Sequence, residues 1–181
     1  MPEPAEAGDT AAAARFIRDA AAVVRPGHIT GARDPGDAWV DGAAGKFWGK
    51  FGSAGLLVFD AGRGILLQHR AIWSHHGGTW GLPGGALHEG EAAVDGALRE
   101  AWEEAGVPRL NVELLFTSVF DVGYWSYTTV AVLARTPFEA IVSDPESLAL
   151  EWVKPDGVAR LPLHPGFASA WPGLRRRLPG A

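Results

Sequence analysis

The sequence contains no cysteine, which excludes disulfide bonds and thiolate metal ligands. Although 47% of its 181 residues are hydrophobic, no uninterrupted apolar run approaches the length needed to span a membrane. The first residues are acidic and lack the basic and apolar segments of a secretory signal peptide. We therefore expect one cytoplasmic domain with no membrane partner.

Positive charge is also scarce, since 16 Lys and Arg stand against 21 Asp and Glu and the net charge is −5. A surface that binds nucleic acid needs an excess of positive charge, so we expect no nucleic-acid partner. A small anionic ligand is not excluded, because a bound cation can supply the missing charge.

Negative charge is concentrated in residues 85–107, where six carboxylates accompany a single cation, Arg99. Residues three and four apart share a helix face, so Glu100, Glu103 and Glu104 are predicted to lie together and to repel one another. Such a cluster suits Mg²⁺, which takes oxygen ligands and is often completed by substrate phosphates. The alternative is a solvated acidic helix face.

The flanking residues favour the metal site, because their spacing is that of the Nudix box, G-x5-E-x7-R-E-U-x-E-E-x-G-U, where U is bulky and apolar. The matching residues are Gly85, Glu91, Arg99, Glu100, Glu103, Glu104, Gly106 and Val107. Only Ala101 is smaller than is usual at the first U position. Over about residues 50–160 the chain resembles a Nudix hydrolase of the MutT-like group.

The resemblance implies hydrolysis of a pyrophosphate bond in a nucleoside diphosphate linked to another group, with Mg²⁺ or Mn²⁺ as cofactor. The implied metal ligands are Gly85, through its carbonyl, and Glu100, Glu103 and Glu104. Arg99 is expected to orient Glu91 and Glu100 by ion pairing.

The base that deprotonates water would be one of these carboxylates or would come from a later loop. Our loop candidate is Glu146, followed by Glu139 and Glu151. For Glu146, an exposed loop glutamate beside Pro145 is an equally good interpretation.

Four residues outside the box are candidates for substrate binding. Arg70, at a strand end, is predicted to meet a phosphate, and Trp73, in a polar loop, to stack on a base. Tyr124 stands where dinucleoside polyphosphate hydrolases tend to carry a tyrosine, although a strand tyrosine is the simpler interpretation. His75 and His76 resemble metal ligands, but adjacent residues rarely bind one ion and no third histidine stands at ligand spacing. We therefore expect His75 at the substrate entrance or simply exposed.

The small single-domain layout and the Leu-Pro-Gly-Gly run that leads into the box resemble the MutT-type group that cleaves (deoxy)nucleoside triphosphates, sometimes oxidised ones. The proline that ADP-ribose hydrolases tend to carry after the box is missing. The alternatives are a pyrophosphatase for dinucleoside polyphosphates, ADP-ribose or nucleotide sugars, and a non-catalytic Nudix module that senses a nucleotide.

Three segments are predicted along the chain: a disordered tail over 1–9, a helix over 10–24 followed by an irregular connection within 10–50, and the Nudix domain over 51–181. The last is expected to contain strands over 51–59, 65–70, 112–122, 124–134 and 148–153, a loop over 82–85, a box helix that stops at Gly106, and a helix over 166–178. This order predicts an α/β fold of the mixed-sheet (α+β) kind. It is a Nudix-type α/β/α sandwich with an added N-terminal helix, which either covers the sheet or joins a partner subunit in a homodimer.

Overall fold

The computed structural model describes residues 36–180, so the predicted tail over 1–9 and helix over 10–24 lie outside the described residues. In chain order the elements are β1 (Trp39–Gly42), β2 (Gly45–Trp48), β3 (Ser53–Asp60), β4 (Gly64–Arg70), β5 (Trp80–Gly81), β6 (Gly84–Ala86), α2 (Ala93–Ala105), the short 3-10 helix η1 (Arg109–Asn111), β7 (Val112–Asp121), β8 (Ser126–Ala134), β9 (Ser147–Val153), α3 (Pro155–Val158) and α4 (Pro165–Arg177). The five predicted strands and the final helix are found to within two residues at each end. None of the helices in this part of the chain is long and apolar enough to cross a membrane.

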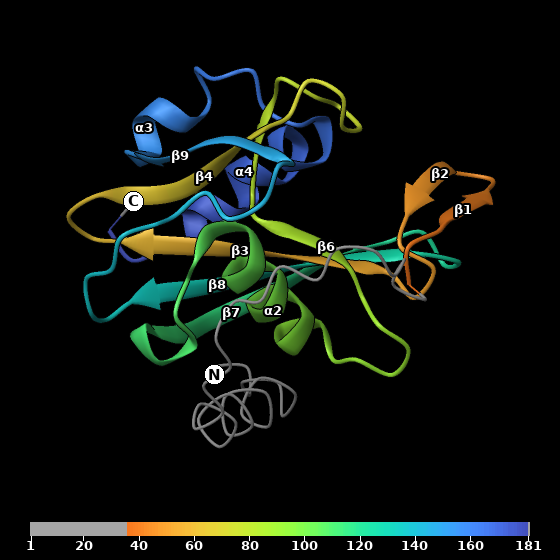
Figure 1. Cartoon of the computed structure of the whole chain (residues 1–181), viewed down its shortest axis with the longest axis horizontal. Helices are drawn as coiled ribbons and strands as arrows, with labels where there is room; N and C mark the ends of the chain where they lie inside the picture. The colour runs from red at the N-terminus through yellow and green to blue at the C-terminus, as the bar shows by residue number, and fades with distance from the viewer. Residues whose placement is uncertain (1–35, 181) are drawn as a thin grey trace, which may run out of the picture.

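A seven-stranded mixed sheet forms the middle layer, with α2 on one face and α4 on the other (Figure 1). Its main path is β5-β4-β3-β8-β7, while β6 pairs with β3 and β9 with β4. Only the β3–β8 pairing is parallel within the described sheet. The predicted α/β/α sandwich is confirmed.

Strand β3 occupies the centre of the sheet because it is apolar on both faces. Its residues are buried almost without a break, as expected for a strand covered on each side. Leu56 and Val58 pack into the core beneath α2, and Leu57 and Phe59 into the core beneath α4. The alternation of side chains along one strand thus joins the two layers.

Helix α2 packs on the sheet through small side chains and ends at a glycine. Ala97, Ala101 and Ala105 are fully buried in the core between α2 and the sheet. Gly106 has φ of 63°, and its N–H bonds back to the carbonyls of the last turn. This left-handed conformation favours glycine and ends the helix, so the predicted stop is confirmed.

Residues 39–48 differ from the prediction, because they form the antiparallel hairpin β1–β2 inside the segment expected to be irregular. Its strands hold aromatic residues that pack across the hairpin, with the rings of Trp39 and Trp48 5.3 Å apart. Phe47 stacks at 4.4 Å on Trp125, which precedes β8. The glycines and aspartates around the strands suggested a loop, whereas contacts with a distant part of the chain stabilise a hairpin.

The prediction of a loop over 82–85 is likewise wrong for its last two residues. Gly84–Ala86 form β6, which pairs with the start of β3. The two backbones approach closely at Gly84. A Cβ atom there would lie 2.3 Å from the carbonyl oxygen of Ala54. Glycine is therefore required by close packing of two main chains.

Replacing Gly84 by alanine should lower the free energy of unfolding by about 1–3 kcal/mol, because backbone cannot move aside as a flexible side chain can. Gly173→Ala is the matched control, since its Cβ would meet only the end of Arg176, at 3.9 Å, and alanine favours the helix interior. Urea unfolding of both variants checks this. Equal stability of the two variants would contradict the close approach.

Candidate active site

Arg99, on α2, gathers the carboxylates of the predicted box. Its Nε and Nη2 donate to the two oxygens of Glu91, each at 2.9 Å, and Nη1 donates to Glu100 at 2.8 Å. A third carboxylate, that of Glu103, lies 3.5 Å from Nη1 and is half exposed. Nη2 also donates to the carbonyl of Ala86 on β6. One guanidinium therefore holds three acidic side chains and fixes α2 against β6.

Glu104 is buried on the sheet side of α2, with 8% of its surface exposed. Its Oε2 accepts a hydrogen bond from the backbone N–H of Gly84 at 2.8 Å. Burial, and then the charge of Glu100, raise the pKa of Glu104 to about 8, although the Gly84 N–H and the side-chain amide of Gln68 oppose this shift.

Glu100 shows the same effect to a smaller degree. Burial raises its pKa to about 7 against the opposing charge of Arg99, and the charges of Glu103 and Asp37 add to the rise. Gly85 lies directly against this carboxylate, since a Cβ there would be 2.7 Å from the carboxyl carbon of Glu100. The backbone of β6 thus reaches the acidic cluster only because residue 85 is glycine.

These donors fit a hard divalent cation. Carboxylate and carbonyl oxygens are the ligands that Mg²⁺ and Mn²⁺ prefer, and a cation would favour the ionised forms that burial disfavours. In the described part of the chain the three carboxylates do not share one partner, because Glu100 and Glu103 pair with Arg99 whereas Glu104 accepts from the N–H of Gly84. Binding of an ion would therefore require their carboxylates to rotate toward a common point.

Glu146, just before β9, lies within electrostatic reach of the cluster. Its charge contributes to the raised pKa of Glu104. The pKa of Glu146 is itself raised, first by partial burial of its carboxyl group and then by Asp144, while Arg70 opposes the rise. Its carbonyl accepts a hydrogen bond from Ala71 at 2.7 Å, which ties this loop to the end of β4. By residue, all three candidate bases are exposed, Glu146 as well as Glu139 and Glu151, which agrees with the interpretation of Glu146 as an exposed loop glutamate.

The predicted substrate residues occupy two places. Arg70, Trp73 and His75 belong to β4 and the loop that follows it. The Nε of Arg70 donates to the carbonyl of His75 at 3.2 Å, and Trp73 is 69% exposed. Tyr124, between β7 and β8, instead donates its hydroxyl to the carbonyl of Gly45 at 2.8 Å and so anchors the β1–β2 hairpin.

Sequence reasoning missed two polar residues at the site. Gln68 is 1% exposed, donates to Ser147 at 2.7 Å and acts on Glu104. A glutamine within the apolar strand β4 was a usable signal, since buried polar groups need partners. Asp37 acts on both Glu100 and Glu146, yet nothing in its Gly-, Asp- and Pro-rich surroundings set it apart.

Comparison with known proteins shows the family and agrees with the fold. The family model of the NUDIX domain matches residues 49–173. A Mycobacterium tuberculosis protein named "Putative 8-oxo-dGTP diphosphatase 3" is 44% identical over 161 residues, which cover 83% of this chain and 74% of that protein. A "Nucleoside triphosphate pyrophosphatase/Nudix hydrolase fusion protein" of Bifidobacterium longum is 39% identical over 159 residues, which cover 83% of this chain and 33% of that longer one. The crystal structure of a Nudix hydrolase from M. smegmatis, RenU, has a TM-score of 0.70 and 45% identity, covering 78% of this chain and 94% of that chain.

The raised pKa of Glu104 predicts how stability depends on pH when a chelator has removed divalent cations. Its pKa is about 8 in the fold against an ordinary value of 4.5, so the folded state binds the proton more tightly. The contribution of Glu104 to stability is therefore lost as pH rises from about 5 to about 8, by up to about 1.4 kcal/mol per pH unit.

Glu104→Gln is the matched control, because an amide cannot ionise. Measured by urea unfolding, the variant should gain stability relative to the natural protein as pH rises through this window. A difference that stays constant with pH would contradict the buried, protonated carboxyl.

Proposed function

The chain belongs to the NUDIX domain family, and we propose that it hydrolyses a pyrophosphate bond in a (deoxy)nucleoside triphosphate, with 8-oxo-dGTP the first substrate to test. One observation carries the proposal: the buried Glu104 and the partly buried Glu100 have carboxyl groups with raised pKa values beside a single arginine. Such a site gains stability from a divalent cation, and a divalent cation attracts phosphate. The names of the mycobacterial and bifidobacterial relatives support this substrate class.

Mg²⁺ or Mn²⁺ would be held by Glu100, Glu103 and Glu104, with the Gly85 carbonyl as a further ligand. When bound, the ion would neutralise phosphate oxygens and lower the pKa of water. Arg99 positions the ligands through its pairing with Glu91, Glu100 and Glu103.

Around this centre, other side chains would handle the proton and the substrate. Glu146 would accept the proton of the attacking water at a carboxylate oxygen, since partial burial of its carboxyl group raises its pKa and its charge reaches Glu104. Arg70 would contact a phosphate, and Trp73 would stack on the base. In hydrolysis the water oxygen would form a new bond to one phosphorus as the bridging P–O bond to it breaks, the other phosphate would leave with the bridging oxygen, and one water proton would go to Glu146.

A substrate panel tests the proposal. It contains nucleoside triphosphates with and without an oxidised base, ADP-ribose, a nucleotide sugar and a dinucleoside polyphosphate, each with Mg²⁺, with Mn²⁺ and with a chelator. Metal-dependent release of phosphorylated products from a triphosphate is expected. Preference for another member would replace the substrate, and binding without turnover would favour a nucleotide-sensing module.

Removing one ligand charge should abolish most activity. We expect Glu103→Gln and Glu104→Gln to lower kcat at least about 100-fold, which corresponds to about 2.7 kcal/mol. Glu89→Gln is the control, because Glu89 is an exposed glutamate of the same box segment and is not an implied ligand. Near-normal rates in both ligand variants would contradict the metal assignment.

Stacking by Trp73 predicts a change in KM more than in kcat. Trp73→Ala should raise KM at least about fivefold, since stacking on a base contributes about 1–3 kcal/mol. Ile72→Ala is the matched control, because Ile72 is an equally exposed apolar neighbour that cannot stack. Steady-state kinetics with the preferred substrate separate the two, and an equal KM for both variants would contradict stacking.

A further inference from the structure

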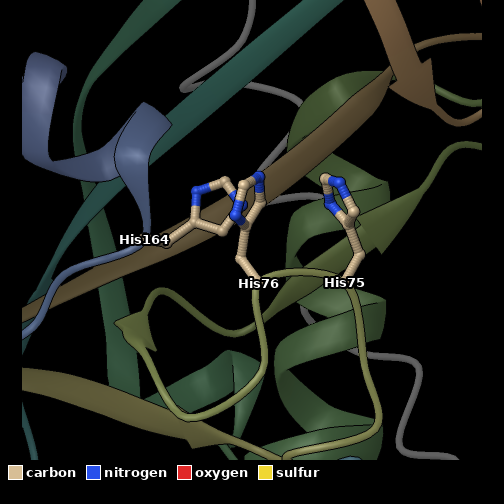
Figure 2. Close-up of side chains that lie close together, drawn as sticks. All are labelled: His75, His76 and His164. Carbon is tan, nitrogen blue, oxygen red and sulfur yellow. The ribbon is translucent and has the colours of Figure 1, made fainter.

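Three histidines that do not belong to the box ligands lie together. One ring nitrogen from each of His75, His76 and His164 lies within 4.8 Å of those of the other two (Figure 2). The ring centroids are 4.1 Å apart for His75 and His76, and 4.7 Å apart for His76 and His164. The expectation that no third histidine accompanies the adjacent pair was therefore wrong, because His164 comes from a segment far along the chain.

The backbone explains how adjacent histidines reach one place. In extended backbone, consecutive side chains point to opposite sides. His76 has φ of 55°, the only positive φ of a non-glycine residue among residues 36–180. Thr79 donates to the carbonyl of His76 at 2.6 Å, and Arg70 donates to the carbonyl of His75. The loop over 71–79 is thus held in a turn that brings both rings to one side.

His164 is positioned by the start of α4. Its N–H donates to the carbonyl of Trp80 at 2.8 Å, and its Nδ1 accepts from the N–H of Gly166 at 3.2 Å. A neutral imidazole has one free lone pair, so a metal ion would take it at the expense of this long hydrogen bond.

The surroundings favour the neutral form of His75 and His164. Burial first, and then the charges of His76 and Arg70, lower the pKa of His75 and bring that of His164 to about 4. The neutral imidazole is the form that binds metal ions. It also attracts phosphate less than the protonated form does, which favours a cation as the occupant.

We propose that His75, His76 and His164 bind one divalent transition-metal ion, Zn²⁺ in the first instance, with a water completing a tetrahedron. Zn–N bonds of about 2.0–2.1 Å place tetrahedral nitrogens about 3.4 Å apart, so the rings close by about 1.4 Å at most. Rotation of the exposed His75 and His76 side chains supplies this movement. The ion joins the loop over 71–79 to the start of α4.

Nitrogen ligands distinguish this site from the glutamate cluster. Imidazole suits Zn²⁺, whereas Mg²⁺ prefers oxygen. The two sites can therefore be tested separately, and zinc binding does not depend on the proposed hydrolysis.

The test is a Zn²⁺ titration by calorimetry of the whole chain without a polyhistidine tag, stripped of metal and kept in excess Mg²⁺ to occupy oxygen sites. One equivalent of Zn²⁺ should bind. His76→Asn and His164→Asn should each weaken binding at least tenfold. Asparagine tolerates positive φ at position 76 and can cap α4 at position 164. His88→Asn, a histidine outside the cluster, should bind as the natural protein does.

Binding that is unchanged in both cluster variants, or absent up to millimolar Zn²⁺, would overturn the proposal. Circular dichroism in chelator shows whether each variant folds. If a variant does not fold, X-ray absorption at the zinc edge of the natural protein decides instead. Three imidazole ligands support the site, and fewer than three overturn it.

Discussion

The constraint on which this molecule depends is a shortage of positive charge beside buried carboxylates. Arg99 contacts Glu91, Glu100 and Glu103, while Glu104 takes its hydrogen bond from a backbone N–H. The pKa values of Glu100 and Glu104 rise to about 7 and about 8 because one guanidinium does not offset their desolvation. A fold that keeps such groups without a partner ion sacrifices stability, and a bound divalent cation would restore it.

Close packing of α2, β6 and β3 buries these carboxylates. Alanines on the buried face of α2 let the helix lie near the sheet, and glycines in β6 let its backbone pass between β3 and the helix. At Gly84 and Gly85 a Cβ would collide with Ala54 and Glu100 respectively. Water is therefore excluded from the sheet side of the cluster, which is what raises the pKa of Glu104.

Local spacing could be predicted from the sequence, and distant contacts could not. The box helix, its stop at Gly106 and the crowding of its glutamates depend on residues a few positions apart. The β1–β2 hairpin depends on the stacking of Phe47 on Trp125, and the histidine cluster on His164 meeting the loop over 71–79. Periodicity within a segment carries no information on such pairs. The same limit explains why Asp37 was missed.

The positive charge of Arg70 repels a zinc ion as it repels a proton on these histidines. Whether the histidine site binds zinc therefore depends on the size of this repulsion relative to the coordination energy. Two unit charges 4 Å apart near a protein surface interact by about 4 kcal/mol, and a divalent ion would feel about twice that. Structural zinc sites in zinc-finger peptides bind with about 10–16 kcal/mol, so a repulsion of this size would weaken coordination of that strength without cancelling it. The negative charge of Glu146 offsets part of this repulsion, because Arg70 and the Glu146 carboxylate interact electrostatically. The balance favours a site that binds zinc more weakly than a structural zinc site does. Its loop is connected to the proposed base, because the N–H of Ala71 donates a hydrogen bond to the carbonyl of Glu146.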